Sequence, residues 1–309
     1  MKIMLKDAFP QMCERGDLSF EELLAPYTSF KIGGPADAFC IPRSIKELVD
    51  MLSFCIVNHL PYFILGKGSN LLISDKGIRA LVISMQGLVK ITRDESYISA
   101  FAGVSLRDLC EFAQAEGLSG LEFASGIPGS VGGAVFMNAG AYGGEIRDLL
   151  YCSKYLEPTV EGLQGDYPVR HLKAEQHEFS YRHSSLQSRK LILLSSVFRL
   201  REDDPHAILA RMQDLDAQRW DKQPMDLPSA GSVFKRPEGH FTGKLVDDCG
   251  LRGFSIGDAM VSNKHCGFIV NNGKATAAEV MQLIRHIQAT VLERFGVRLE
   301  TEIRMVGEM

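Results

Sequence analysis

Between residues 126 and 144 the chain reads Gly126-Ile-Pro-Gly-Ser-Val-Gly-Gly-Ala-Val-Phe-Met-Asn-Ala-Gly-Ala-Tyr-Gly-Gly144. Seven of these nineteen residues are glycine, and none is Lys or Arg. Glycine tolerates positive φ and lets the main-chain N–H approach a ligand closely. Successive amides in such a turn form a concave anion site that needs no cationic side chain. We therefore predict a cradle for the diphosphate of a dinucleotide such as FAD; the alternative is a run of tight structural turns.

A second glycine turn, Leu65-Gly-Lys-Gly-Ser-Asn70, follows the strand-like run Tyr62–Leu65. Two such turns suit a cofactor that is held at two points. The turn is not a G-x-G-x-x-G, because Leu71 stands where the third glycine is required, and the chain contains no G-x-x-x-x-G-K-[ST]. The two commonest nucleotide-binding signatures are therefore absent, and a dinucleotide would be bound by a different architecture.

Composition narrows the class of protein. The 309 residues are 45% hydrophobic and 23% charged, with a formal net charge of −4. These values argue against nucleic acid or an anionic membrane as a partner. The seven cysteines are scattered, odd in number and without CxxC spacing, so we expect reduced thiols in a cytoplasmic protein and no zinc site. No signal peptide or apolar segment of membrane-spanning length is evident.

Hydrophobic periodicity predicts mixed helices and strands in three consecutive parts, residues 1–85, 86–200 and 201–309. The caps of three helices are readable from the sequence. They are Ser44 with a capping box to Glu47 before a helix from Ile45, Ser105 and Gly117 around Leu106–Glu116, and Thr276, Glu279 and Gly296 around the last helix. A further helix is expected near Ala207–Trp220, and strands at Leu71–Ser74, Leu81–Ile83, Leu191–Leu194 and Leu299–Ile303.

Several polar motifs could carry chemistry, and each also has a plain structural interpretation. Ser232 follows a glycine beside cationic residues, so it could donate a proton, although a serine in a turn is the simpler reading. Arg182, next to Tyr181, suits a substrate carboxylate because its planar fork pairs bidentately; a surface ion pair is the alternative. Glu300 and Glu302 are expected on one side of a strand, which is most often a solvated face. No His or Cys cluster suggests a metal.

Taken in order, these motifs resemble the UDP-N-acetylenolpyruvoylglucosamine reductase family over nearly the whole chain, from about Tyr27 to Gly307. The resemblance rests on seven separate stretches, which together are far more specific than any one of them. They are Tyr27–Asp37, Leu65–Asn70, Gly126–Gly144, Tyr181–Ser184, Ala230–Pro237, Val261–Asn271 and Leu299–Gly307.

The resemblance implies an α/β (α+β) protein. Residues 1–85 and 86–200 would be two subdomains of an FAD-binding fold of the vanillyl-alcohol-oxidase type, and residues 201–309 an α+β substrate-binding domain whose last strand returns to the flavin site. It also implies non-covalent FAD, NADPH as hydride donor and a UDP-linked enolpyruvyl amino sugar as substrate. The covalent alternative is disfavoured because Asn70 stands where some relatives of the wider fold carry a flavin-linked histidine.

Site residues follow from the same resemblance. The catalytic positions fall on Arg182, Ser232 and Glu302, and the substrate-contacting positions on Tyr181, Lys222 and His265. The cofactor-binding positions are Gly66, Lys67, Gly68, Ser69, Asn70, Ser125, Gly126, Ile127, Pro128, Gly129, Ser130, Gly132, Gly133, Asn138, Ala139 and Gly140.

In the family reaction, hydride reaches the terminal carbon of the enol ether. Arg182 would polarise the substrate carboxylate, and Ser232 would protonate the adjacent carbon, with Lys235 and Arg236 as candidate cations beside it. Only Ser185–Lys190 separates the Tyr-Arg-x-Ser motif from the next strand, so the chain resembles the subgroup without a substrate-lid tyrosine. The alternatives are another FAD oxidoreductase acting on an alcohol or hydroxy acid, and a non-catalytic nucleotide-binding protein. We expect a monomer.

Overall fold

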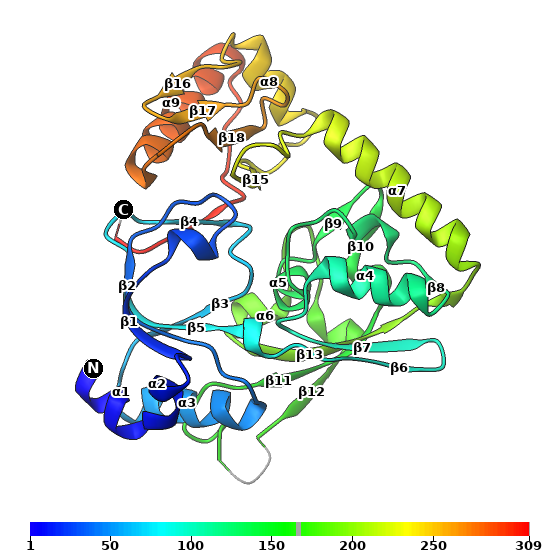
Figure 1. The fold of residues 1–309 in the computed structure, drawn as a ribbon. Helices are drawn as coiled ribbons and strands as arrows, with labels where there is room; N and C mark the ends of the chain where they lie inside the picture. The colour runs from blue at the N-terminus through cyan, green and yellow to red at the C-terminus, as the bar shows by residue number, and fades with distance from the viewer. Residues whose placement is uncertain (165–167, 309) are drawn as a thin grey trace. The chain divides into compact units, whose positions relative to one another are not determined.

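The computed structural model describes residues 1–164 and 168–308 (Figure 1). These residues form two compact units, each assembled from segments that are distant in sequence. Unit 1 comprises Met1–Phe20, Ala38–Lys67 and Ala80–Ala217, and unit 2 comprises Glu21–Asp37, Gly68–Arg79 and Gln218–Met309. The boundaries at 20/21, 37/38 and 79/80 fall inside strands β1 (Leu18–Leu23), β2 (Pro35–Cys40) and β5 (Ile78–Ser84).

The first part of the chain builds a four-stranded sheet of order β1-β2-β5-β3, in which β3 (Tyr62–Leu65) pairs with β5 in parallel. Helix α3 buries Leu48, Met51, Leu52 and Cys55. The remaining elements of this part are α1 (Lys2–Ala8), α2 (Pro10–Glu14), η1 (Ala25–Tyr27), α3 (Ile45–Val57) and η2 (Met85–Gly87).

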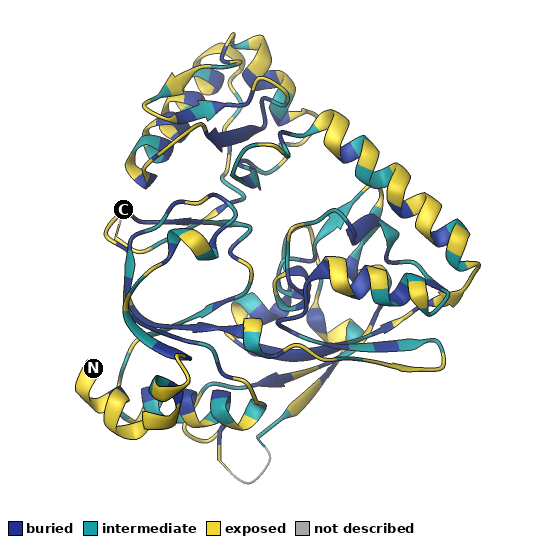
Figure 2. Cartoon of the chain, viewed as in Figure 1, coloured by how far each residue is buried: buried dark blue, intermediate teal, exposed yellow. Residues whose placement is uncertain are grey.

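The centre of unit 1 is an antiparallel five-stranded sheet of order β12-β11-β13-β7-β6. Helix α5 packs on β13 and β7, with α4 beside it (Figure 1). The strands are dark blue in much of Figure 2, because their side chains form the buried core of this unit. The elements are β6 (Ile91–Asp94), β7 (Tyr97–Phe101), α4 (Leu106–Ala115), β8 (Leu118–Ser119), η3 (Glu122–Ala124), α5 (Val131–Phe136), β9 (Gly140–Ala141), β10 (Gly144–Glu145), η4 (Ile146–Asp148), β11 (Leu150–Leu156), β12 (Arg170–Lys173), η5 (Ala174–His177), α6 (Ser185–Ser188), β13 (Ile192–Arg199) and β14 (Arg201–Glu202).

Unit 2 has a core of its own, in which the apolar face of α9 packs with residues of the sheet β15-β18-β17-β16. A separate parallel pair joins β19 to β4, with Arg304 opposite Leu71 and Val306 opposite Ile73. Helix α7 is exposed along much of its length (Figure 2) and leads from unit 1 into unit 2. The elements are β4 (Leu71–Ile73), α7 (Pro205–Lys222), β15 (Ser229–Ser232), α8 (Thr242–Asp248), β16 (Ser255–Ile256), β17 (Ala259–Val261), β18 (Phe268–Asn271), α9 (Ala277–Phe295) and β19 (Arg304–Val306).

Most of the cap predictions are confirmed. Ser105 caps α4 and Gly117 follows that helix at φ +65°. Both hydrogen bonds of the box between Thr276 and Glu279 form, and α9 ends at Gly296 in the left-handed conformation. These signals are local, so no tertiary partner is needed to read them.

Two local predictions are wrong. Ser44 accepts from Glu47 N, but the Glu47 carboxylate accepts from Arg43 N at 2.8 Å in place of Ser44 N, so the capping box of α3 is incomplete. The expected strand Leu299–Ile303 is reduced to one bridge at Thr301, and the regular strand β19 begins only at Arg304. The strands expected at 71–74, 81–83 and 191–194 are present as β4, β5 and β13, with shifted ends.

Candidate flavin and substrate site

The short turn Gly66–Asn70 presents main-chain donors without partners. None of its five amide groups donates to an acceptor among the described residues. Its carbonyls, by contrast, are held in place: Gln86 Nε2 donates to Gly66 O, and Ser29 N donates to Gly68 O. Gly68 is buried and Lys67 is exposed, and consecutive unpaired amides in such a turn form an anion-binding concavity. This turn therefore fits the oxygens of a diphosphate.

The long glycine segment meets the short turn at Ser130. A Cβ on Gly66 would lie 2.7 Å from Ser130 Oγ, so the backbone of Gly66 packs against the Ser130 side chain. Within 126–133, only the amides of Gly126 and Ser130 have no acceptor in the part of the chain that the structure describes. Gly66 and Ser130 thus lie close together within unit 1.

Much of the long segment serves the protein itself. Gly132 N donates to Ala102 O, and a Cβ at that position would lie 3.0 Å from Ala102 Cβ. The second half of the segment folds into the hairpin β9–β10, where Gly144 lies against the ring of Phe123. This half of the segment therefore contributes a hairpin to the fold, and its role in cofactor binding stays a prediction.

Two predicted cofactor residues direct their side chains into the protein. Ser125 is buried, and its hydroxyl contacts Glu122 O and Asp216 Oδ1 at 3.0 and 3.2 Å. The Asn138 side chain is also buried and fully hydrogen-bonded within unit 1. Any contact of these two residues with a cofactor would go through the main chain.

Arg182 lies in a tight turn between Ser180 and His183, whose main chains exchange two hydrogen bonds of 3.2 and 3.1 Å. Its φ is +56°, a left-handed conformation that is uncommon for a residue with a long side chain. The guanidinium carbon lies 5.2 Å from the ring centre of Tyr181, which is half exposed. A strained backbone at a candidate catalytic residue is a common feature of functional sites.

In unit 2, Ser232 and Glu302 are brought together although seventy positions separate them in sequence. Ser232 ends β15, and the following Val233 accepts a hydrogen bond of 2.7 Å from Glu302 N. Asn70 adds a second tie, because its Nδ2 donates to Glu302 O at 3.2 Å and its carbonyl accepts from Arg304 N at 2.9 Å. The structure thus places the end of the short glycine turn beside Glu302.

The two cations expected near Ser232 each contact another side chain. Lys235 Nζ forms an exposed ion pair of 3.1 Å with Glu300, and Arg236 lies over the ring of Phe241 at 4.0 Å. The sequence alone did not predict these two contacts, because each partner side chain is brought into place by the fold.

The predicted substrate residues of unit 2 lie in different settings. Lys222 is the exposed last residue of α7. His265 is half-buried; its Nδ1 accepts from Gly267 N at 3.0 Å, and burial lowers its pKa. The neutral ring therefore carries its proton on Nε2, where it can donate to a ligand.

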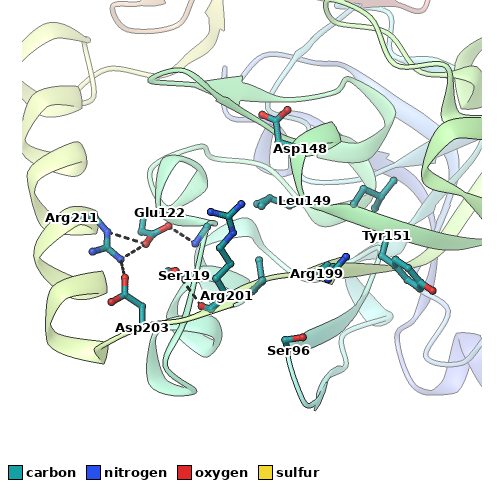
Figure 3. A pocket seen from close by; sticks show the side chains of 13 residues that line it. Ser96, Ser119, Glu122, Asp148, Leu149, Tyr151, Arg199, Arg201, Asp203 and Arg211 are labelled. Carbon is teal, nitrogen blue, oxygen red and sulfur yellow. Dashed lines mark hydrogen bonds and ion pairs between the residues drawn. The ribbon is translucent and has the colours of Figure 1, made fainter.

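Figure 3 shows a cleft of about 950 Å³ in unit 1, where Arg211 of α7 pairs with Glu122 and Asp203. None of the predicted site residues lines it.

Among residues 1–164 and 168–308, no group of three or more His, Cys, Asp or Glu side chains could hold a metal ion. Over the same residues, no helix has the length and apolar character needed to cross a bilayer.

Two family models match the chain. Residues 36–153 match an FAD binding domain, and residues 223–306 match the C-terminal domain of UDP-N-acetylenolpyruvoylglucosamine reductase. The first match covers Gly66–Asn70 and Ser125–Gly140, and the second covers Ser232 and Glu302. The unpaired amides described above fit the cofactor of the first family, and the expected α+β flavin-binding fold is confirmed.

Full-length relatives agree with the two family matches. The chain is 47% identical to the UDP-N-acetylenolpyruvoylglucosamine reductase of Listeria welshimeri, over 98% of this chain and 99% of the relative. It is 44% identical to that of Caldanaerobacter subterraneus subsp. tengcongensis over 100% of both chains. The crystal structure of the reductase from Thermus caldophilus superposes with a TM-score of 0.77 at 36% identity, covering 93% of this chain and 98% of that one. The chain therefore belongs to the UDP-N-acetylenolpyruvoylglucosamine reductase family.

Proposed function

We propose that the chain reduces the enolpyruvyl ether of UDP-N-acetylglucosamine enolpyruvate to UDP-N-acetylmuramate, a step of peptidoglycan precursor synthesis, with FAD bound and NADPH as the hydride donor. The observation that carries this proposal is the 44–48% identity to reductases of that name over nearly the whole chain. We also propose that the reaction takes place in the cytoplasm and that the enzyme works as a monomer. We further propose that the chain divides at about residues 85 and 200 into two FAD-binding subdomains and a substrate-binding domain.

The cofactor part of the proposal rests on the unpaired amides. Gly66 to Asn70, with Gly126 and Ser130, would bind the FAD diphosphate through main-chain N–H groups. Bound FAD, reduced by NADPH, supplies the hydride that adds to the terminal carbon of the substrate double bond.

The substrate part assigns one role to each catalytic residue. Arg182 holds the substrate carboxylate and stabilises the negative charge that develops on the neighbouring carbon. Ser232 gives its hydroxyl proton to that carbon, so the double bond gains one hydride and one proton and NADPH becomes NADP⁺. Glu302, whose main chain is joined to Val233, orients the groups around the carboxylate. Tyr181, Lys222 and His265 contact the substrate, with Lys222 near its diphosphate.

Ser232→Ala tests the proton donor. Reduction of the flavin by NADPH should stay near the wild-type rate, while reoxidation by the enolpyruvyl nucleotide should slow by about 100-fold or more. Stopped-flow absorbance of the flavin measures both half-reactions separately. Ser255→Ala, an exposed serine of β16 in the same unit, is the matched control and should change neither.

Wild-type rates in both half-reactions of Ser232→Ala would refute the proton-donor assignment. An FAD oxidoreductase acting on an alcohol or hydroxy acid would show no reoxidation by the enolpyruvyl nucleotide even in the wild-type protein. A non-catalytic nucleotide-binding protein would remain colourless or hold flavin that does not turn over.

A further inference from the structure

The turn that carries Arg182 is fixed by side chains outside it. Asn138 Nδ2 donates to Ser180 O at 3.2 Å, on the residue that opens the turn. Gln187 Nε2 donates to Arg182 O at 3.1 Å. Since a left-handed non-glycine residue persists only where its surroundings enforce it, these two amides help to maintain the backbone of Arg182.

Asn138 is itself placed by helix α5. The Asn138 N–H donates to Val135 O and the Ala139 N–H donates to Ala134 O, which is the pattern of a Schellman motif with Asn138 as the left-handed residue at φ +43°. Phe136 O, at the end of the same helix, accepts from Ser184 Oγ and from Gln187 Nε2, both at 2.8 Å. The Arg182 turn is therefore hydrogen-bonded to the C-terminal end of α5.

The partners of the Asn138 amide determine its orientation. Its Nδ2 faces two acceptors, Ser180 O and Glu145 Oε2 at 2.9 Å, while its Oδ1 accepts from Arg147 N at 3.1 Å. The residue is only 1% exposed. Every polar atom of this buried side chain is thus engaged, and no other side chain has the same two donors and one acceptor at that length.

We propose that Asn138 is a positioning residue for Arg182: its amide holds the Ser180–His183 turn so that the guanidinium meets the substrate carboxylate in the correct orientation. The proposal rests on the proposed function of Arg182. It adds to the sequence-based assignment of Asn138 to the cofactor, because the Asn138 side chain faces the arginine turn.

Asn138→Gly is the direct test, since glycine adopts the left-handed conformation and removes only the side chain. Reoxidation of the reduced flavin by the enolpyruvyl nucleotide should slow by about 10- to 100-fold, the scale of a small misplacement of a catalytic group. Flavin reduction by NADPH should change by less than about threefold. Asn58→Gly is the matched control, because Asn58 also ends a helix and bonds its own helix through Nδ2; both half-reactions should stay unchanged.

A double-mutant cycle separates positioning from a general loss of structure. In an Arg182→Ala background, Asn138→Gly should slow reoxidation by less than about threefold more, because the group on which it acts is gone. Equal losses in both backgrounds, or no loss in wild type, would overturn the proposal.

If Arg182→Ala alone left reoxidation at the wild-type rate, the proposed function of Arg182 would fail, which is a separate result. Gln187→Leu removes the hydrogen bond to Arg182 O, and its effect on reoxidation should depend on Arg182 in the same way. If Asn138→Gly does not fold, the result for Gln187→Leu tests the proposal.

Discussion

The two glycine segments use their backbones differently. The short turn Gly66–Asn70 leaves all five amides without an acceptor among the described residues. The longer segment from Gly126 to Gly144, which contains seven glycines, leaves only two such amides between residues 126 and 133, and its second half forms a hairpin. The presence of glycines therefore does not by itself locate an anion site, whereas unpaired amides indicate where an anion would bind.

Gly66→Ala should have the largest effect on cofactor binding. Its Cβ would lie 2.7 Å from Ser130 Oγ, so either the hydroxyl turns away from Gly133 N, which it caps, or the two glycine segments separate. We expect FAD affinity to fall by about 100-fold, the equivalent of one to two lost hydrogen bonds to a charged group. Titration of the apoprotein with FAD, followed by flavin fluorescence, measures this.

The double variant Gly66→Ala/Ser130→Gly removes the clashing hydroxyl and puts glycine, a tolerated N-cap residue, in place of the serine cap of α5. It should recover most of the lost affinity. An affinity that stays at the wild-type level in Gly66→Ala alone would show that the contact between the two segments does not matter for FAD.

Gly144→Ala should show the opposite pattern. Its Cβ would lie 2.6 Å from Phe123 Cδ1, in the buried contact between the hairpin and η3. Overpacking of this kind costs about 1–3 kcal/mol of unfolding free energy. Urea denaturation of the apoprotein should show that loss, while FAD affinity changes by less than about threefold. A large loss of affinity with no loss of stability would remove the distinction between the two segments.

Gly143→Ala should have the smallest effect. The residue has φ +85°, and no atom lies within 4 Å of the position that an alanine methyl group would take, so only backbone strain opposes the change. The expected cost is about 1 kcal/mol of unfolding free energy. Thermal unfolding measures it, and unchanged FAD affinity is again expected. A loss of FAD affinity would mean that the hairpin tip contacts the cofactor.

The sequence was sufficient for the features that depend on near neighbours. The cap signals at Ser105 and Thr276 predict their helices because both partners of each hydrogen bond lie within one turn. The capping box at Glu47 failed because the main chain of Arg43 offered a second donor to the same carboxylate. The pairing of β19 with β4 joins residues more than two hundred positions apart, and no local pattern specifies such a partner.

The same limit applies to the candidate site. The sequence identified Ser232 and Glu302 as candidate residues. It did not predict the hydrogen bonds of Glu302 with Val233 and Asn70 that join them. The contacts of Lys235 with Glu300 and of Arg236 with Phe241 were missed for the same reason, because they form only in the folded chain. The proposed role of Asn138 became visible only from the burial of its side chain and from its partners, the acceptors Glu145 and Ser180 and the donor Arg147.

The central claim is that main-chain amides, and not a cationic side chain, bind the diphosphate of FAD. Lys67 is the one cation in the short turn and is exposed, so Lys67→Met tests the claim most directly. If amides provide the binding, titration of the apoprotein should show FAD affinity falling by less than about fivefold, the ~1 kcal/mol of an exposed charge pair. A loss of about 100-fold, or a wild-type apoprotein that takes up no FAD, would contradict the account.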